Sequence, residues 1–247
     1  MIRIEGLSKS FDSLKVLDNL SLEIKEGETK VVIGRSGCGK SVLLKHIMGL
    51  LKPDRGKIFI EDKEITQLNE EQLKPIRMKM GMVFQGGALF DSLTVAENVG
   101  FVLREHYRLD DLEILKQVRQ ALRMVELEGI EDLMPAQLSG GMKKRVAIAR
   151  VLCMKPKIIL YDEPTTGVDP ITADSINNLI RSLHDKLKVT SIVVTHDIRS
   201  AYKIADRIAM LYQGKIIAEG TPFEIQNTKD PILFQFINGL SQGPIET

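Results

Sequence analysis

The sequence predicts a mixed α/β fold in which short buried strands alternate with helices. Two segments, Thr29–Ile33 and Ser191–Thr195, are rich in β-branched residues, as expected for strands covered on both faces. A glycine-rich segment, Gly34–Ser41, separates the first of these from a helix-like run at 42–48. Residues 93–153 carry almost no strand signal and several helical patterns. At 247 residues, the chain is long enough for one α/β domain with an inserted helical subdomain.

The strands fall into two predicted sheets. Residues 2–7, 15–25 and 57–61 alternate between apolar and polar side chains, which is typical of an antiparallel sheet with one solvated face. We expect a second, mostly parallel sheet from the more uniformly apolar segments 29–33, 80–84, 157–162, 190–195 and 207–212.

Helices are predicted from apolar spacing and from start signals. Asp110–Val125 has apolar residues at spacings of three and four, and Pro170 follows Asp169 as the first residue of a helix to about residue 187. In the tail, Asp230 and Pro231 are a helix-start signal. The apolar residues that follow fall on one face of the predicted helix: Ile232, Leu233, Phe236, Ile237 and Leu240. Such a face either packs on the chain's own core or contacts a second copy or a regulatory partner.

The glycine-rich segment fits the pattern G-x-x-x-x-G-K-[ST] at every fixed position, reading Gly34-Arg35-Ser36-Gly37-Cys38-Gly39-Lys40-Ser41. Its glycines let backbone N–H groups converge on one point, and the following helix adds its positive end there. Lys40 would reach the β- and γ-phosphates of a nucleotide, and the Ser41 hydroxyl would ligate Mg²⁺. The segment therefore predicts a nucleotide site formed by all eight residues.

Two carboxylates follow the apolar strand 157–162. Asp162 suits a magnesium role, usually through water, because Mg²⁺ keeps several waters and takes few carboxylates. Glu163 is placed one residue further on, where a general base could orient the attacking water. An acidic pair after a strand is often only a solvated turn, but the phosphate loop favours the functional interpretation.

The segment Leu138-Ser139-Gly140-Gly141-Met142 resembles the signature motif of ABC ATPases, usually LSGGQ. Ser139 can cap the helix that follows, and the two glycines expose backbone N–H groups at its start. The resemblance covers about residues 1–220. It implies that Gln85 is the Q-loop residue and a metal ligand, that His196 is the switch histidine, and that Gly167-Val168-Asp169 form the D-loop. It also implies that Phe11 stacks on adenine, with Val16 on the ribose side. The departure from the family pattern is Met142 in place of Gln.

The resemblance implies an α/β P-loop NTPase (RecA-like) core with a flanking antiparallel β subdomain and an inserted α-helical signature subdomain. We expect the core at 1–92 and 154–220, the helical subdomain at 93–153 and a helical tail at 221–247. It also implies an ATPase that uses ATP and Mg²⁺, with catalysis by Glu163, His196, Lys40 and Gln85. In a homodimer, Ser139, Gly140 and Gly141 would cover the nucleotide held by the opposite protomer.

Within the family, the run Gly86–Val99 and Met142 look like the ATPase subunit of the Mla-type lipid transporters. That resemblance implies an integral membrane permease, an MCE-type lipid-binding protein and room for a small regulatory subunit. An ABC importer or exporter for another solute remains the alternative. A non-transport ABC ATPase acting on DNA or ribosomes is disfavoured, because the chain has no room for coiled-coil insertions or a second ATPase.

Composition is consistent with a peripheral subunit. The net charge of +1 gives no electrostatic reason to expect nucleic acid binding or direct adsorption to a membrane. No run approaches the roughly 18 apolar residues that span a bilayer, and Met1–Glu5 does not resemble a signal peptide. The two cysteines, Cys38 and Cys153, cannot form a disulfide framework. We expect a cytoplasmic protein on the inner face of the inner membrane, in contact with the membrane only through partners.

Overall fold

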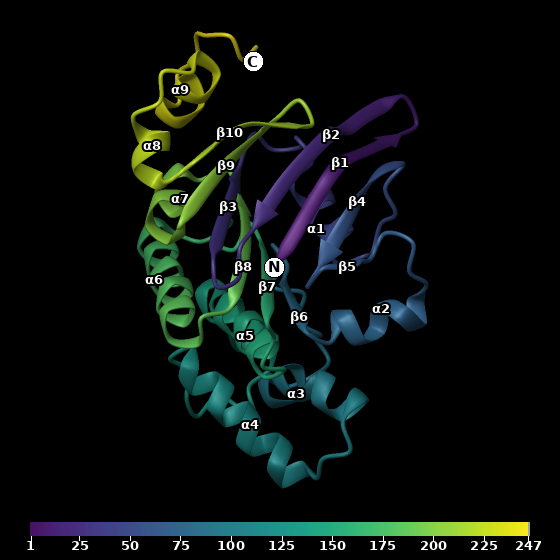
Figure 1. Cartoon of the computed structure of the whole chain (residues 1–247). Helices are drawn as coiled ribbons and strands as arrows, with labels where there is room; N and C mark the ends of the chain where they lie inside the picture. The colour runs from purple at the N-terminus through teal and green to yellow at the C-terminus, as the bar shows by residue number, and fades with distance from the viewer. Residues whose placement is uncertain (247) are drawn as a thin grey trace. The chain divides into compact units, whose positions relative to one another are not determined.

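The computed structural model describes residues 1–246 (Figure 1). The chain divides into two compact units. The first unit contains Met1–Lys74 and the chain from Thr190 onward. The second unit contains Pro75–Val189.

An antiparallel sheet occupies the N-terminal part of the first unit, in the order β2-β1-β4-β5. Its strands are β1 (Ile2–Phe11), β2 (Leu14–Ile24), β4 (Arg55–Ile60) and β5 (Lys63–Glu64). The apolar positions of the alternating pattern are buried, as at Ile2 and Ile4. The predicted strands at 2–7, 15–25 and 57–61 are therefore confirmed; β5, two residues long, carries too few residues to show a pattern.

The first unit also contains parallel strands. The strand β3 (Thr29–Ile33) lies between β8 (Thr190–Thr195) and β9 (Arg207–Tyr212) and is parallel to both. These strands lie where the sequence predicts them. Like β5, the strand β10 (Lys215–Gly220) was not predicted; it returns antiparallel to β9 through a turn at Gln213 and Gly214, both with positive φ.

A lysine in the middle of the first parallel strand is compatible with burial because it is paired. Lys30 is 1% exposed, and its Nζ lies 2.9 Å from Oε1 of Glu28 and 2.5 Å from Oε1 of Glu219. Although burial works to raise the pKa of Glu219, hydrogen bonds from Lys30 and Arg207 hold that pKa below its usual value. The charge of a buried lysine is tolerated only with such partners.

The second unit combines one parallel strand pair, β6 (Met80–Val83) with β7 (Ile158–Asp162), and most of the long helices. These helices are α3 (Val95–His106), α4 (Asp111–Met124), the short 3₁₀ helix η1 (Pro135–Gln137), α5 (Gly140–Leu152) and α6 (Pro170–Leu187). The Asp110 carboxylate accepts from Glu113 N at 2.8 Å at the start of α4, and Asp169 caps α6 in the same manner. The predicted helices at 110–125 and 170–187 are thus confirmed with their caps.

The remaining helices are short. They are α1 (Lys40–Ile47), α7 (Ile198–Ile204), α8 (Pro222–Gln226) and α9 (Pro231–Asn238) in the first unit, and α2 (Glu70–Arg77) at the boundary between the units. In the part of the chain that the structure describes, no helix is both long and apolar enough to cross a membrane.

The tail helix α9 begins at its predicted cap, Asp230, but its predicted apolar face is only partly covered. Leu233 is 1% exposed. Leu240 was wrongly predicted to belong to this face: α9 ends at Asn238, Gly239 turns the backbone with a φ of 62°, and Leu240 lies beyond the helix with 47% of its surface exposed. The other well-buried position is polar: Gln235 is 4% exposed, accepts from Ile245 N at 2.6 Å and donates to Ile245 O at 3.1 Å. The side-chain amide of Gln235 thus ties the end of the chain to α9, a contact that periodicity alone does not reveal.

Candidate nucleotide-binding and catalytic residues

The phosphate loop connects β3 to α1 in the first unit. Gly37 and Gly39 adopt φ angles of 79° and 106°, a left-handed backbone that favours glycine. Lys40 is 5% exposed, and its Nζ donates to Gly34 O at 2.9 Å and to Arg35 O at 3.0 Å. The loop therefore curls around a positively charged group at the start of a helix, and both features favour an anion there.

The two residues predicted to face the base and the ribose lie on β1 and β2. A Cβ built on Gly39 would lie 2.9 Å from Cγ1 of Val16, so Val16 packs directly against the phosphate loop. Phe11 ends β1 with 42% of its surface exposed, and the ammonium of Lys9 lies 5.6 Å from the centre of its ring. An exposed aromatic ring of this kind can stack on a purine.

Sequence reasoning did not anticipate that the C-terminus reaches the phosphate loop. Nη1 of Arg35 donates to the backbone carbonyl of Glu246 at 2.5 Å. A cavity of about 470 Å³ adjoins this contact and is lined by Arg35, Ser36, Gly37, Cys38, Tyr212, Gln213, Pro244 and Glu246. Nothing in the local sequence pattern links Arg35 to a residue more than 200 positions away.

His196 follows β8 in the same unit and is exposed. The next residue, Asp197, caps α7 by accepting from Arg199 N at 3.0 Å and Ser200 N at 3.3 Å. Asp197 N donates in turn to Oγ1 of Thr195 at 3.0 Å. The backbone on either side of His196 is therefore held in place by these hydrogen bonds.

The two predicted carboxylates lie at the end of β7 in the second unit. Asp162 is the last residue of the strand and Glu163 follows it, each 7% exposed. Glu163 has a φ of 48°, which is uncommon for a residue other than glycine and stores backbone strain. The Thr166 hydroxyl donates to Oε2 of Glu163 at 3.2 Å. The site residue predicted as the base is thus buried, strained and oriented by a hydrogen bond.

Gln85 lies two residues after β6 and its side chain is exposed. Its backbone carbonyl accepts a hydrogen bond from Nζ of Lys144 on α5. Burial lowers the pKa of Lys144, and the negative charge of Glu163 works in the opposite direction. The sequence pattern carries no signal for this contact, because Lys144 lies between two other basic residues, Lys143 and Arg145.

The signature segment begins α5. Ser139 accepts from Met142 N at 3.2 Å, which confirms the predicted cap. A Cβ built on Gly141 would lie 2.6 Å from Cγ2 of Thr172, so this glycine allows the signature segment to approach the start of α6 closely. At that start, Asp169 accepts from the Thr172 hydroxyl at 2.5 Å, and hydrogen bonds from Thr172 hold the pKa of Asp169 below its usual value. The signature and D-loop residues are therefore neighbours within the second unit.

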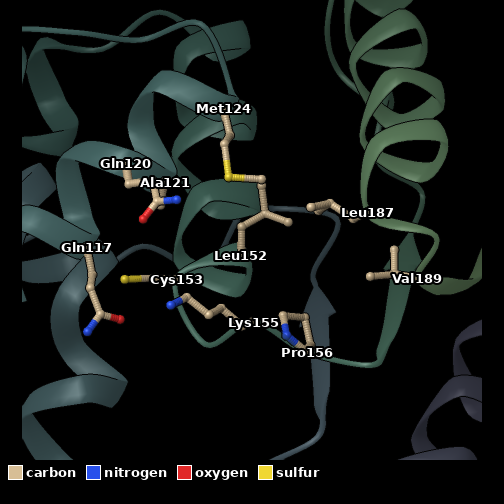
Figure 2. Close-up of a pocket in the computed structure, with 10 residues that line it drawn as sticks. All are labelled: Gln117, Gln120, Ala121, Met124, Leu152, Cys153, Lys155, Pro156, Leu187 and Val189. Atoms are coloured by element: carbon tan, nitrogen blue, oxygen red, sulfur yellow. The ribbon is translucent and has the colours of Figure 1, made fainter.

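The second unit also contains a cavity of about 350 Å³ that includes none of the predicted site residues (Figure 2). It is lined by Gln117, Gln120, Ala121, Met124, Leu152, Cys153, Lys155, Pro156, Leu187 and Val189. Burial raises the pKa of the Cys153 thiol to about 11. Neither Cys38 nor Cys153 is in a disulfide.

Comparison with known proteins supports the family assignment made from the motifs. The sequence profile of the ABC transporter family matches residues 17–166. The chain is 40% identical, over 99% of its length and 93% of the other protein, to the intermembrane phospholipid transport system ATP-binding protein MlaF of Haemophilus influenzae. It is 42% identical to the chloroplastic protein TRIGALACTOSYLDIACYLGLYCEROL 3 of Arabidopsis thaliana, over 99% of this chain and 75% of that protein.

A third relative is the probable ribonucleotide transport ATP-binding protein mkl of Mycobacterium leprae, 40% identical over 99% of this chain and 70% of that protein. Among solved structures, the ATP-binding cassette MJ0796, in a dimeric post-hydrolysis state with ADP and Pi, is 37% identical with a TM-score of 0.83. The structural match covers 90% of this chain and 99% of the MJ0796 chain. The chain therefore belongs to the ABC transporter family, has the mixed α/β fold of its ATP-binding subunits, and is an ATPase.

Proposed function

We propose that this chain is the ATP-hydrolysing subunit of a transporter that moves phospholipid across a cell envelope, together with an integral membrane permease and an MCE-type lipid-binding protein. The observation that carries the proposal is the 40% identity to a phospholipid transport ATPase over nearly the full length of both chains. That length includes residues 86–99, where the sequence resembles the lipid-transport subgroup.

The phosphate loop is the proposed site for the ATP phosphates. Lys40 already lies inside the loop, and a Cβ on Gly37 would meet no atom within 4 Å, so there is open space beside the backbone N–H groups. Phe11 would stack on the adenine, and Val16 would contact the ribose side. These residues fit a nucleoside triphosphate better than a smaller anion, because they combine an anion site with an exposed aromatic ring.

A magnesium ion fits the residues that surround the proposed reaction. Within residues 1–246, no group of three or more His, Cys, Asp or Glu side chains could hold a metal on its own. Mg²⁺ at a nucleotide site takes few protein oxygens, of which one or two come from carboxylates, in addition to phosphates and waters. Ser41, Asp162 and Gln85 would supply those oxygens, and the bound ion would offset charge on the phosphates.

Glu163 is the proposed general base. Its carboxylate is buried, and the Thr166 hydroxyl orients one oxygen at 3.2 Å, so it can accept a proton from a water in a defined direction. Lys40, Gln85 and His196 complete the proposed catalytic set by binding the transferred phosphoryl group and the water.

We further propose that two copies of the chain act as a dimer, as MJ0796 forms in its solved structures. Ser139, Gly140 and Gly141 of one copy would cover the ATP of the other, and Asp169 would lie near the same nucleotide. Exposed glycine N–H groups at the start of α5 suit this anion-binding role. Loss of the γ-phosphate would remove contacts that hold the copies together and open the dimer.

In this proposal the chain is peripheral on the cytoplasmic face of the inner membrane and contacts the bilayer only through its partners. The proposed domain division places the nucleotide core at 1–92 and 154–220, the signature subdomain at 93–153 and a helical tail at 221–247. A small regulatory subunit has room in the assembly, and nucleic acid has no role in it.

The base assignment is tested by replacing Glu163 with Gln, which keeps the shape of the side chain and removes the proton acceptor. We expect turnover to fall by about 10² to 10⁴-fold while ATP still binds. The Glu163→Gln protein should accumulate as an ATP-bound dimer in size-exclusion chromatography, because closure precedes hydrolysis. Near-normal ATP turnover in this variant would overturn the assignment.

The substrate is tested by isolating the membrane proteins that co-purify with the full chain and reconstituting the complex in vesicles with a fluorescent phospholipid. We expect ATP-dependent movement of the lipid, which the same complex carrying Glu163→Gln does not support. The competing candidate is ribonucleotide transport, because the mkl relative is also 40% identical. ATP-dependent uptake of a labelled ribonucleotide without lipid movement would favour that candidate and contradict ours.

A further inference from the structure

Arg145, on the signature helix α5, makes hydrogen bonds to two other helices. Its Nη1 donates to the backbone carbonyl of Val125 at 2.6 Å, at the end of α4. Its Nη2 donates to the hydroxyl of Ser175 at 2.8 Å, in the second turn of α6. A guanidinium presents its N–H groups in one rigid plane, so the two bonds together fix the direction of the side chain. Arg145 therefore joins α4, α5 and α6 at one point of the second unit.

The bonds to Val125 and Ser175 matter more than the third contact of Arg145, an ion pair with Glu126. That pair is 2.8 Å apart, but the side chain of Glu126 is 73% exposed, and exposed ion pairs contribute little. The side chain of Arg145 is only 15% exposed. The carbonyls at the end of a helix lack partners within it and carry partial negative charge, which suits a guanidinium at Val125.

The two helices that meet at the Arg145–Ser175 bond begin with the signature and D-loop residues. Ser139 caps α5, and Asp169 caps α6. About one turn before the bond, Gly141 allows a second close contact between the same helices, against Thr172, as described above. Two contacts one turn apart oppose both sliding and rotation of α5 against α6. The starts of the two helices therefore keep a fixed spacing.

We propose that Arg145 is a positioning residue for ATP hydrolysis: it joins α5 to α6 and α4, and so holds the signature and D-loop segments at the spacing that lets both reach one nucleotide of the opposite copy. It acts through Ser175 and the end of α4 and does not touch the nucleotide. The proposal rests on the proposed dimer, in which residues 139–141 and Asp169 of one copy lie near the ATP of the other. An error of about 1 Å in such a spacing can cost about 100-fold in rate.

The first experiment measures assembly of the full chain carrying Glu163→Gln, in which the ATP-bound dimer should accumulate. Arg145→Lys keeps the charge and loses the planar fork, whereas Ser175→Ala removes only the hydroxyl on α6 and places a good helix former there. Ser182→Ala, two turns further along the same helix, is the matched control.

Analytical ultracentrifugation with Mg-ATP gives the dimer Kd of each variant. We expect it to rise about 10- to 100-fold for Arg145→Lys and about 3- to 10-fold for Ser175→Ala, as the loss of hydrogen bonds to a charged group does. Ser182→Ala should leave it unchanged. The affinity of the monomer for ATP should be unchanged in all three, because the phosphate loop lies in the first unit.

A second experiment measures steady-state ATP hydrolysis with Glu163 intact. We expect kcat to fall about 10- to 100-fold for Arg145→Lys. Adding Ser175→Ala to Arg145→Lys should cost less than about a further twofold, because both changes break the same bond. Independent, fully additive losses would overturn the proposal.

The remaining outcomes separate positioning from folding and from the dimer itself. A dimer Kd and a kcat that Arg145→Lys leaves unchanged would overturn the positioning role and leave the dimer standing. So would a loss of monomer ATP affinity and melting temperature that parallels the loss of dimers, since damage to the fold would then account for it. If the Glu163→Gln chain stays monomeric with ATP while Arg145 is intact, the proposed dimer is contradicted, and the role of Arg145 fails with it.

Discussion

Two glycines of the phosphate loop, Gly34 and Gly37, should respond differently to the same small change. A Cβ on Gly34 would lie 2.5 Å from the backbone oxygen of Leu211 and 2.8 Å from Sγ of Cys38. A Cβ on Gly37 would meet no atom within 4 Å, but Gly37 has a φ of 79°. Alanine at Gly34 is therefore opposed by a steric clash, and alanine at Gly37 only by backbone strain.

The magnitudes follow from these contacts. The sulfur of Cys38 can rotate away, but Leu211 lies in β9 and pairs with Ile216 of β10, so its carbonyl cannot yield without disturbing the sheet. An overpacked site costs up to about 3 kcal/mol when rigid atoms are involved. Left-handed backbone at an alanine costs about 1 kcal/mol. For a chain of 247 residues, these values correspond to falls in melting temperature of about 6–12 °C for Gly34→Ala and about 2–4 °C for Gly37→Ala.

Circular dichroism of the nucleotide-free variants during heating measures both shifts under identical conditions. The order of the two melting temperatures is the decisive result, because it does not depend on the conversion from free energy. If Gly37→Ala melts at the same temperature as Gly34→Ala or below it, the carbonyl of Leu211 is not the limiting contact. The geometric reasoning would then be refuted.

Two further predictions concern the surroundings of the loop. A maleimide should label the half-exposed Cys38 and leave Cys153 unlabelled, because Cys153 is buried and its thiol has a pKa of about 11. Mg-ATP should protect Cys38 from the maleimide. Equal labelling of Cys38 with and without ATP would place the nucleotide elsewhere. Deletion of residues 230–247 should lower the melting temperature of the monomer by about 6–12 °C, since it removes the buried side chains of Leu233 and Ile245. An unchanged melting temperature with a loss of ATP-dependent dimers would instead identify the tail as an interaction element.

Features that depend on neighbours in the chain could be predicted from the sequence. The strand Thr29–Ile33, the phosphate loop and the helix after it follow one another directly, so composition and glycine spacing suffice to place them. The caps Asp110, Ser139 and Asp169 were predictable for the same reason, because a cap bonds to the backbone two or three residues ahead.

Features that depend on distant partners were decided by the tertiary structure. Gln235 looks like a solvated residue on an apolar helix, but it is buried because the backbone of Ile245 satisfies its amide. Arg35 reaches Glu246, and Lys144 reaches Gln85 across 59 positions of the chain. A polar side chain can be buried only where another group completes its hydrogen bonds or balances its charge, and that group is known only once the chain has folded. The sequence thus determined which chemistry this ATPase carries, and the fold determined which polar residues support it.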